Sequence, residues 1–99
     1  MKNLEPYILQ IRALCSKFHV AKLFVFGSIL TDKFSSKSDV DFVVDFDDLP
    51  FSEYAKNYFD LKTALEETVN RSVDLLENQA IKNPYIRKSI DSNKELIYG

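Results

Sequence analysis

The stretch Leu23–Phe46, LFVFGSILTDKFSSKSDVDFVVDF, is predicted to form two strands joined by a turn that starts at a glycine. The first strand, Leu23–Phe26, is aromatic and β-branched and stops at Gly27, which is typical of a buried strand. The second strand, from Asp39 to Phe46, alternates in character, and alternation along a strand separates side chains onto two faces. The sequence therefore predicts two consecutive strands that carry most of the chemically active residues of the chain.

Asp39 and Asp41 project from the same face of the second strand, side by side near its start. Aspartate is depleted in strands, and like charges at neighbouring positions on one face repel each other. One interpretation is a solvated strand face whose carboxylates meet water. The other is a divalent-cation site, because Mg²⁺ takes carboxylate oxygens, usually from one or two residues together with substrate phosphates. A bound ion would also remove the repulsion.

Gly27 and Ser28 favour the cation-site interpretation. A glycine after a buried strand, followed by a hydroxyl residue that can cap a short helix, presents free backbone N–H groups to an anion. This predicted phosphate cradle and the acid pair then lie at adjacent ends of two consecutive strands.

A chain of 99 residues has the length of one domain, so we expect residues 1–99 to form a single domain with no separate substrate domain. No segment is long and apolar enough to cross a membrane, and the first residues lack the apolar core of a signal peptide, which predicts a cytoplasmic location. A net charge of −2 argues against direct capture of nucleic acid.

The single cysteine and the single histidine exclude an internal disulfide and a zinc cluster of His and Cys ligands. Cys15 falls on the apolar stripe of a first helix, which Asn3 can cap and which holds Pro6 in its opening turn. We therefore expect Cys15 in the core. His19 follows the helix, where we expect a satisfied or solvent-facing side chain rather than a catalytic one.

The remainder of the chain predicts further elements in a regular order. A break at residues 47–50 precedes a long helix with an apolar face that ends near Asn70. A third strand, a helix opened by Asn83 and Pro84, and a short closing strand follow. The apolar face of the long helix consists of Tyr54, Tyr58, Leu61, Leu65 and Val69.

Asp74 is the notable residue of the third strand, which spans Ser72–Glu77. Apolar residues flank it on both sides, so its carboxylate faces away from them, and a lone carboxylate inside a sheet needs a partner or an ion. A salt bridge to Arg71 or to a surface lysine is one interpretation. A third carboxylate on the metal side is the other, and the upstream motif favours it.

The pattern of Gly27-Ser28, ten intervening residues, Asp39-Val40-Asp41 and the later strand acid Asp74 resembles the minimal nucleotidyltransferase domain of the DNA polymerase β superfamily. The resemblance covers nearly the whole chain. It implies an α/β (α+β) fold in the order helix, strand, short helix, strand, long helix, strand, helix. The implied sheet is mixed and three-stranded, with its first two strands antiparallel and its second and third parallel, and the closing strand can extend it.

The resemblance also implies a role for each motif residue. Asp39 and Asp41 would ligate two Mg²⁺ ions, and Asp74 would act as a further ligand or as the base for an attacking hydroxyl. Gly27 and Ser28 would hold a nucleoside triphosphate, ATP by the resemblance. Minimal members commonly pair with a helical HEPN-type protein, as antitoxin with toxin, so the implied reaction is AMP transfer to a hydroxyl of that partner.

One departure from the family pattern concerns the nucleotide. Typical members carry an Arg-Gly pair shortly after Gly-Ser, and here those positions are Thr31 and Asp32. A cation is lost beside the triphosphate and an acid is gained, which lowers nucleotide affinity unless Lys33 or Lys37 compensates. Two further interpretations therefore stay open. A catalytically weak binding module could neutralise its partner stoichiometrically, or a free-standing enzyme could modify a small molecule or an RNA end.

Overall fold

The computed structural model describes residues 2–35 and 37–99. No helix within these ranges is both long and apolar enough to span a membrane. The elements follow the predicted order and are η1 (Lys2–Tyr7), α1 (Ile8–Lys17), β1 (Val20–Phe26), η2 (Gly27–Leu30), β2 (Val40–Phe46), α2 (Phe51–Val69), β3 (Val73–Glu77), η3 (Asn78–Ala80), α3 (Pro84–Asn93) and β4 (Glu95–Tyr98).

The strands form one mixed sheet in the order β3-β2-β1-β4. β1 pairs antiparallel with β2, and β2 pairs parallel with β3, as the resemblance implied. The parallel pair needs a crossover connection, which α2 supplies. β4 pairs antiparallel with β1, so the closing strand is present and makes the sheet four-stranded.

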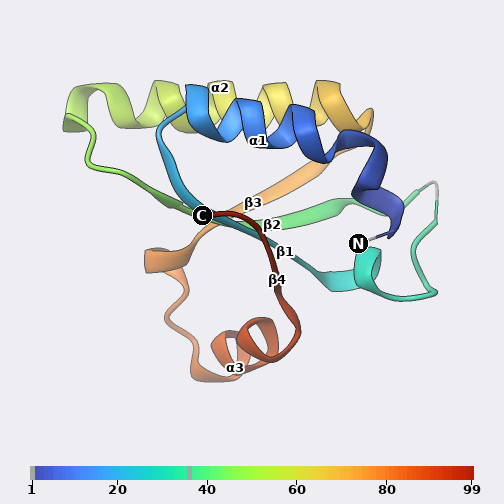
Figure 1. Ribbon diagram of the computed structural model, residues 1–99. Helices are drawn as coiled ribbons and strands as arrows, with labels where there is room; N and C mark the ends of the chain where they lie inside the picture. The colour runs from blue at the N-terminus through green and yellow to red at the C-terminus, as the bar shows by residue number, and fades with distance from the viewer. Residues whose placement is uncertain (1, 36) are drawn as a thin grey trace.

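Helices cover the two faces of the sheet unequally. α1 and α2 lie together on one face, whereas α3 alone lies on the other (Figure 1). The main core fills the space between the sheet and the helix pair, where Phe42, Leu61 and Leu65 are fully buried. Val43, which alternates to the opposite face, is buried together with Ile90 of α3. The face under α3 therefore has a smaller apolar layer of its own.

α2 has the predicted apolar face. Leu61, Leu65 and Val69 are buried, and the half-buried tyrosines Tyr54 and Tyr58 reach β3 through their hydroxyls. The aromatic stripe is thus part of the packing. The helix ends at Val69, and its C-cap Asn70, with a left-handed φ of 54°, turns the chain toward β3.

The N-terminal helix differs from the prediction. Asn3 does not cap it, because residues Lys2–Tyr7 form a 3₁₀ helix that contains Pro6, and α1 begins at Ile8. The side-chain amide of Asn3 instead donates to the carbonyl oxygen of Ile29 at 3.4 Å. A tertiary contact to η2 therefore takes the side chain that the local pattern assigned to a cap.

Cys15 and His19 lie as predicted. Cys15 is fully buried, and burial raises the pKa of its thiol to about 12, so the group stays protonated at neutral pH. His19 is exposed in the turn between α1 and β1, with a φ of 60°.

Candidate active site

Gly27 ends β1 and opens η2 with a φ of +84°, a conformation that residues with a Cβ rarely adopt. A Cβ at this position would lie 2.5 Å from Oδ2 of Asp41 on the neighbouring strand. The backbone conformation therefore favours glycine, and a side chain here would also have to displace the carboxylate of Asp41. The consequence is that bare backbone lies directly against a carboxylate.

Ser28 lies inside η2 and does not cap it, which corrects one detail of the prediction. The N-cap is Phe26, and the positive φ of Gly27 starts the helix directly after the strand. The carbonyl oxygen of Ser28 accepts hydrogen bonds from both the N–H and the hydroxyl of Thr31, at 2.9 and 2.8 Å. The predicted short helix after Gly27 is confirmed.

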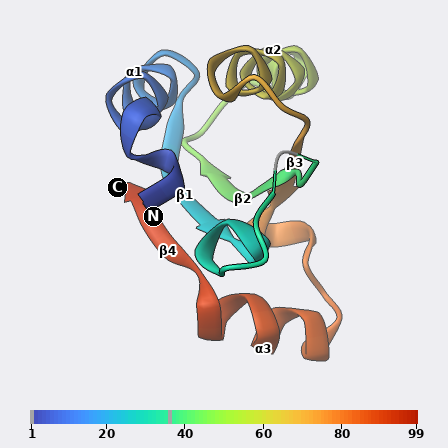
Figure 2. The same cartoon turned by 90° about the vertical axis from the view of Figure 1, so that its right-hand side faces the viewer.

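Asp41 and Asp74 are direct neighbours across the parallel pair of β2 and β3, so both carboxylates point to the same face of the sheet. Asp39 comes just before β2, which begins at Val40. Burial, followed by the charges of Asp74 and Asp39, raises the pKa of Asp41 above its ordinary value. The fold thus brings the predicted acids together on the α3 face, at the end of the sheet that Figure 2 views.

Asp74 is exposed, whereas the sequence pattern predicted a buried acid. The reason is the alternation along β3: Asp74 points away from the buried side chains of Val73 and Leu75, toward the face that α3 alone covers, and stays accessible there. Arg71, the alternative partner, donates to the carbonyl oxygens of Ser35 and Ser38 at 2.6 and 3.1 Å. Arg71 therefore ties down the loop that leads to Asp39.

The acid group offers carboxylate oxygens to a metal ion. Within residues 2–35 and 37–99, no three His, Cys, Asp or Glu side chains stand close enough to enclose a metal by themselves. Mg²⁺, however, usually binds through one or two carboxylates plus waters and substrate phosphates. The neighbouring carboxylates of Asp41 and Asp74 supply such donors, and a cation would relieve the repulsion that Asp41 experiences. The residues fit a metal that arrives with phosphates.

A cavity of about 500 Å³ opens beside Gly27, between η2 and the C-terminal end of α3. Phe26, Gly27, Leu30 and Thr31 line one side of it, and residues of α3 and the start of β4 line the other. Because Gly27 borders both this cavity and Asp41, a ligand in the cavity can extend to the acid group. Sequence reasoning missed the α3 side, since nothing in that helix resembles a motif.

One of the two positions that replace the family's Arg-Gly pair borders this cavity. Thr31 lines the cavity, but its hydroxyl is bonded to Ser28. Asp32, Lys33 and Lys37 are exposed, and the N–H of Lys33 donates to the hydroxyl of Thr31 at 3.2 Å. The structure thus places a short neutral group, Thr31, on the cavity wall.

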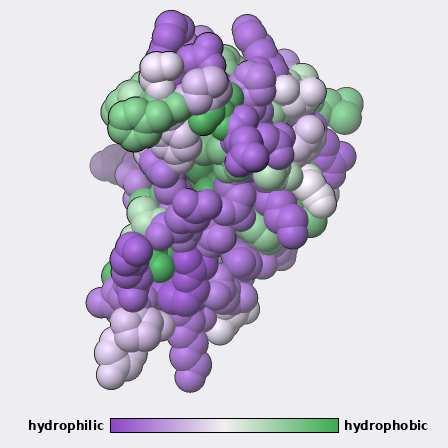
Figure 3. Space-filling model, turned by 90° about the vertical axis from the view of Figure 1, so that its left-hand side faces the viewer, coloured by the Kyte–Doolittle hydropathy of each residue, from purple (hydrophilic) through white to green (hydrophobic). Residues whose placement is uncertain are grey.

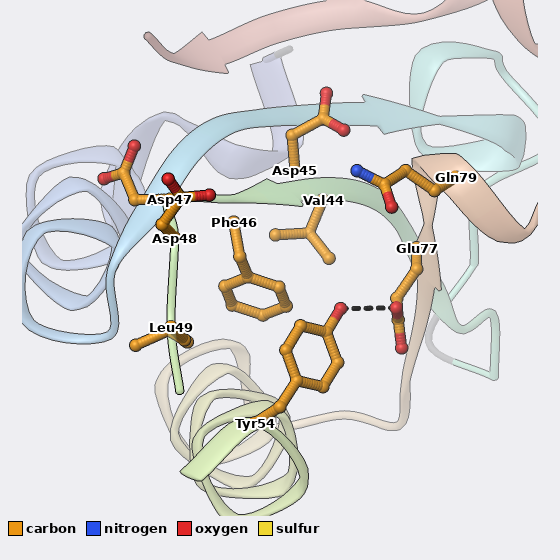
Figure 4. Close-up of a pocket in the computed structure, with 9 residues that line it drawn as sticks. All are labelled: Val44, Asp45, Phe46, Asp47, Asp48, Leu49, Tyr54, Glu77 and Gln79. Atoms are coloured by element: carbon orange, nitrogen blue, oxygen red, sulfur yellow. Dashed lines mark hydrogen bonds between the residues drawn. The ribbon is translucent and has the colours of Figure 1, made fainter. Parts of the chain in front are cut away.

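A second, smaller cavity of about 180 Å³ lies at the other end of the sheet, where β2 and β3 finish. Figure 3 views the molecule from this end, and hydrophilic residues cover most of that face. In Figure 4, Phe46 and Tyr54 face each other with ring centroids 5.4 Å apart, and the hydroxyl of Tyr54 donates to the carboxylate of Glu77. Neither Gly27 nor Asp41 lines this cavity, so it is separate from the candidate site.

Comparison with known proteins identifies the class. The model of the polymerase β nucleotidyltransferase family matches residues 10–99, and the chain belongs to this family. A Methanocaldococcus jannaschii protein named "Putative protein adenylyltransferase MJ0128" is 39% identical over 87 residues, which are 88% of this chain and 84% of that protein. The family and fold class expected from the motif are therefore confirmed.

Solved structures share the fold at low sequence identity. One is a toxin–antitoxin with AMP-PNP, with a TM-score of 0.72, 18% identity, and coverage of 93% of this chain and 73% of the other. Another is a tri-AMPylated HEPN toxin of Shewanella oneidensis in complex with its MNT antitoxin, with a TM-score of 0.67, 16% identity, and coverage of 96% and 71%. These similarities extend the fold assignment to nearly the whole chain.

Proposed function

We propose that this protein is a Mg²⁺-dependent adenylyltransferase that moves AMP from ATP to a hydroxyl of a HEPN-type helical partner, as antitoxin to its toxin. The observation that carries the proposal is the contact of the Gly27 backbone with the Asp41 carboxylate, beside the acid Asp74. Bare backbone next to clustered acids suits a phosphate chain held through a divalent cation.

The comparisons support the reaction and the partner. A relative over most of the chain is named a protein adenylyltransferase. Proteins of the same fold occur in a toxin–antitoxin with AMP-PNP and beside an AMPylated HEPN toxin. These names and complexes belong to the related proteins. For this chain they favour ATP as the donor and a protein hydroxyl as the acceptor.

Each residue of the candidate site has its own role in the proposed reaction. The reaction is attack of a hydroxyl on the α-phosphorus of ATP, with pyrophosphate as the leaving group. Asp39 and Asp41 would hold the metal, with Asp74 as a further donor beside Asp41, and the bound metal would supply the positive charge that stabilises the entering and leaving oxygens. Asp74 stands at an exposed edge strand, where an incoming partner can reach it and where its carboxylate can accept the proton of the hydroxyl. The Gly27 turn orients the phosphates.

A second candidate is favoured by Thr31. Threonine carries no charge, so the position that carries arginine in the family offers no cation to a triphosphate. The hydroxyl of Thr31 also already donates a hydrogen bond to the carbonyl oxygen of Ser28. A chain with weak nucleotide affinity could still neutralise a partner by covering its surface. In that case the carboxylates would serve no reaction.

The deciding experiment incubates the protein with labelled ATP, Mg²⁺ and its HEPN-type partner. We expect label on the partner, loss of that label in Asp39→Asn with Asp41→Asn, and an intact complex in both cases. Asp48→Asn, an exposed acid beyond the far end of β2, is the matched control and should label like the wild type. A stable complex that never takes up label would exclude the transferase and favour the binding module.

A further inference from the structure

The backbone around Asp39 is held by the turn between α2 and β3, which lies outside the motif that carries the acids. We propose that Arg71, in this turn, is a positioning residue of the candidate site: it holds the chain in front of Asp39 so that the carboxylate stands in place for the cation. This inference rests on the proposed function, because it takes Asp39 as a ligand of the metal that accompanies the nucleotide.

The two peptide groups that flank Asp39 are both hydrogen-bonded to this turn. In the peptide group before Asp39, the carbonyl oxygen of Ser38 accepts from Nη1 of Arg71 at 3.1 Å. In the peptide group after it, the N–H of Val40 donates to the carbonyl oxygen of Ser72 at 3.1 Å. Because each peptide group is planar, only the two dihedral angles of Asp39 separate these anchors, and those angles set the direction of its side chain. Arg71 therefore holds one of the two peptide planes that orient Asp39.

The remaining contacts of Arg71 suit an arginine in particular. Its Nη1 atom also donates to the carbonyl oxygen of Ser35 at 2.6 Å. Its Cζ atom lies 4.3 Å from the ring centroid of Phe34. A guanidinium group can stack its flat face on a ring while its N–H groups donate in the plane, whereas the ammonium group of lysine has no flat face. One side chain thus holds the loop at residues 34, 35 and 38.

The turn that carries Arg71 is itself anchored on both sides. Before Arg71, the C-cap Asn70 has a left-handed φ of 54°. After it, the N–H of Val73 donates to the carboxylate of Glu66 on α2 at 3.1 Å. Arg71 is half-buried between these points. The guanidinium group is therefore presented to the loop from a fixed support.

The position of Asp39 depends on this support more than that of Asp41 does. Asp39 is exposed and comes before the first residue of β2, whereas Asp41 is half-buried inside the strand. Mg²⁺ requires near-ideal octahedral geometry, so a displaced ligand lowers its affinity. Removing a group that orients a metal ligand typically costs about 10–100-fold in metal affinity. Because Asp39 shares the metal with Asp41 and phosphates, we expect the lower end of that range, about tenfold.

The test measures the Mg²⁺ concentration at which the full chain reaches half-maximal binding of a non-hydrolysable ATP analogue, by calorimetric titration. In Arg71→Ala this Mg²⁺ requirement should rise about tenfold. Arg71→Lys keeps the charge but not the stacked fork, so a smaller rise is expected. Arg12→Ala is the matched control, because Arg12 also donates to a backbone carbonyl oxygen, that of Ile97 on β4 at 3.0 Å. This control should lose stability but keep the wild-type Mg²⁺ requirement.

Two further measurements separate positioning from a general loosening of the fold. In an Asp39→Asn background, Arg71→Ala should raise the Mg²⁺ requirement no further, because the carboxylate that Arg71 positions is gone. Independent effects, in which the two fold-changes multiply, would overturn the inference. In the metal-free chain, the amide hydrogen of Val40 should exchange faster in Arg71→Ala, while amides in the middle of β1 are unaffected. Unchanged exchange at Val40 would also overturn it.

The outcomes distinguish this inference from the proposed function. A wild-type Mg²⁺ requirement in Arg71→Ala would overturn the inference alone. If that variant does not fold, Arg71→Lys decides in its place, and a wild-type requirement there has the same meaning. A raised requirement that disappears in the Asp39→Asn background would support the inference even if no partner is labelled. If the wild type binds no nucleotide at any Mg²⁺ concentration, the inference fails together with the proposed function.

Discussion

Both ends of the sheet carry acidic side chains, but the surroundings of these carboxylates differ between the two ends. At the far end, Glu77 accepts a hydrogen bond from Tyr54, and Asp45 accepts one from the side-chain amide of Asn78 at 3.3 Å. At the near end, burial and then the charges of Asp74 and Asp39 raise the pKa of Asp41. A carboxylate that accepts hydrogen bonds from the protein therefore has a structural role, whereas a carboxylate held close to other acids indicates a binding site for a cation.

The largest expected effect comes from removing the carboxylate charges at the near end of the sheet. Asp39→Asn with Asp41→Asn should lower AMP transfer to the partner by at least about a hundredfold, because preorganised charge at the reacting phosphate is lost. Asp47→Asn with Asp48→Asn, at the far end, should leave transfer nearly unchanged. Initial rates of label incorporation measure both variants. Similar losses at the two ends would remove the distinction between them.

Restoring the family's Arg-Gly pair should raise the affinity of the near end of the sheet for ATP. Thr31→Arg with Asp32→Gly supplies a charge-assisted contact to the triphosphate, worth about 1.5–3 kcal/mol, or about ten- to a hundredfold in affinity. Titration with ATP and Mg²⁺ measures the gain, and transfer to the partner should quicken with it. If neither the wild type nor this variant labels a partner, while Asp39→Asn with Asp41→Asn still neutralises it in cells, the binding module is the correct account.

Gly27→Ala tests the close approach of backbone and carboxylate. The left-handed φ alone should cost about 1–2 kcal/mol, and the contact with Asp41 adds to that. Placing the same substitution in an Asp41→Ala background should recover the contact part only. Urea unfolding of the four proteins gives the coupling free energy. Strictly additive losses would mean that Gly27 and Asp41 do not crowd each other.

Without metal, Asp41→Asn should have the smallest effect of these substitutions, a change in melting temperature that depends on pH. The pKa of Asp41 is raised in the folded chain above its ordinary value of 3.8, so the folded state binds the proton more tightly than the unfolded state. The free energy of unfolding therefore falls as the pH rises from 3.8 to the raised pKa of Asp41 in the folded chain. Without metal, Asp41→Asn should melt slightly higher than the wild type at pH 7 and no higher at pH 3. A variant that is less stable at pH 7 would contradict the repulsion argument.

Sequence reasoning singled out the candidate residues because their signals are local. Gly27 adopts a positive φ that favours glycine, and Asp39 and Asp41 are two residues apart at the start of β2. What it missed depends on tertiary structure. The exposure of Asp74 follows from the sparse helix cover on its face of the sheet, and the role of Asn3 follows from a contact with Ile29.

The α3 wall of the cavity was missed for the same reason. Asn93 and Ser92 carry no motif, and only the fold brings their helix beside Gly27. Arg71 illustrates the converse case. The sequence offered it to Asp74 as an ion-pair partner, whereas the fold uses it to hold the carbonyls of Ser35 and Ser38 before Asp39.

The most direct test of the acid group is a melting experiment with Mg²⁺ and a non-hydrolysable ATP analogue. Ligand at a hundredfold excess over its Kd should stabilise the wild type by about 2.7 kcal/mol, because it binds only the folded state. Asp48→Asn should show the same rise in melting temperature, and Asp41→Asn should lose most of it. If Asp41→Asn keeps the full metal-dependent rise, Asp41 is not a ligand and the near end of the sheet is not the active site.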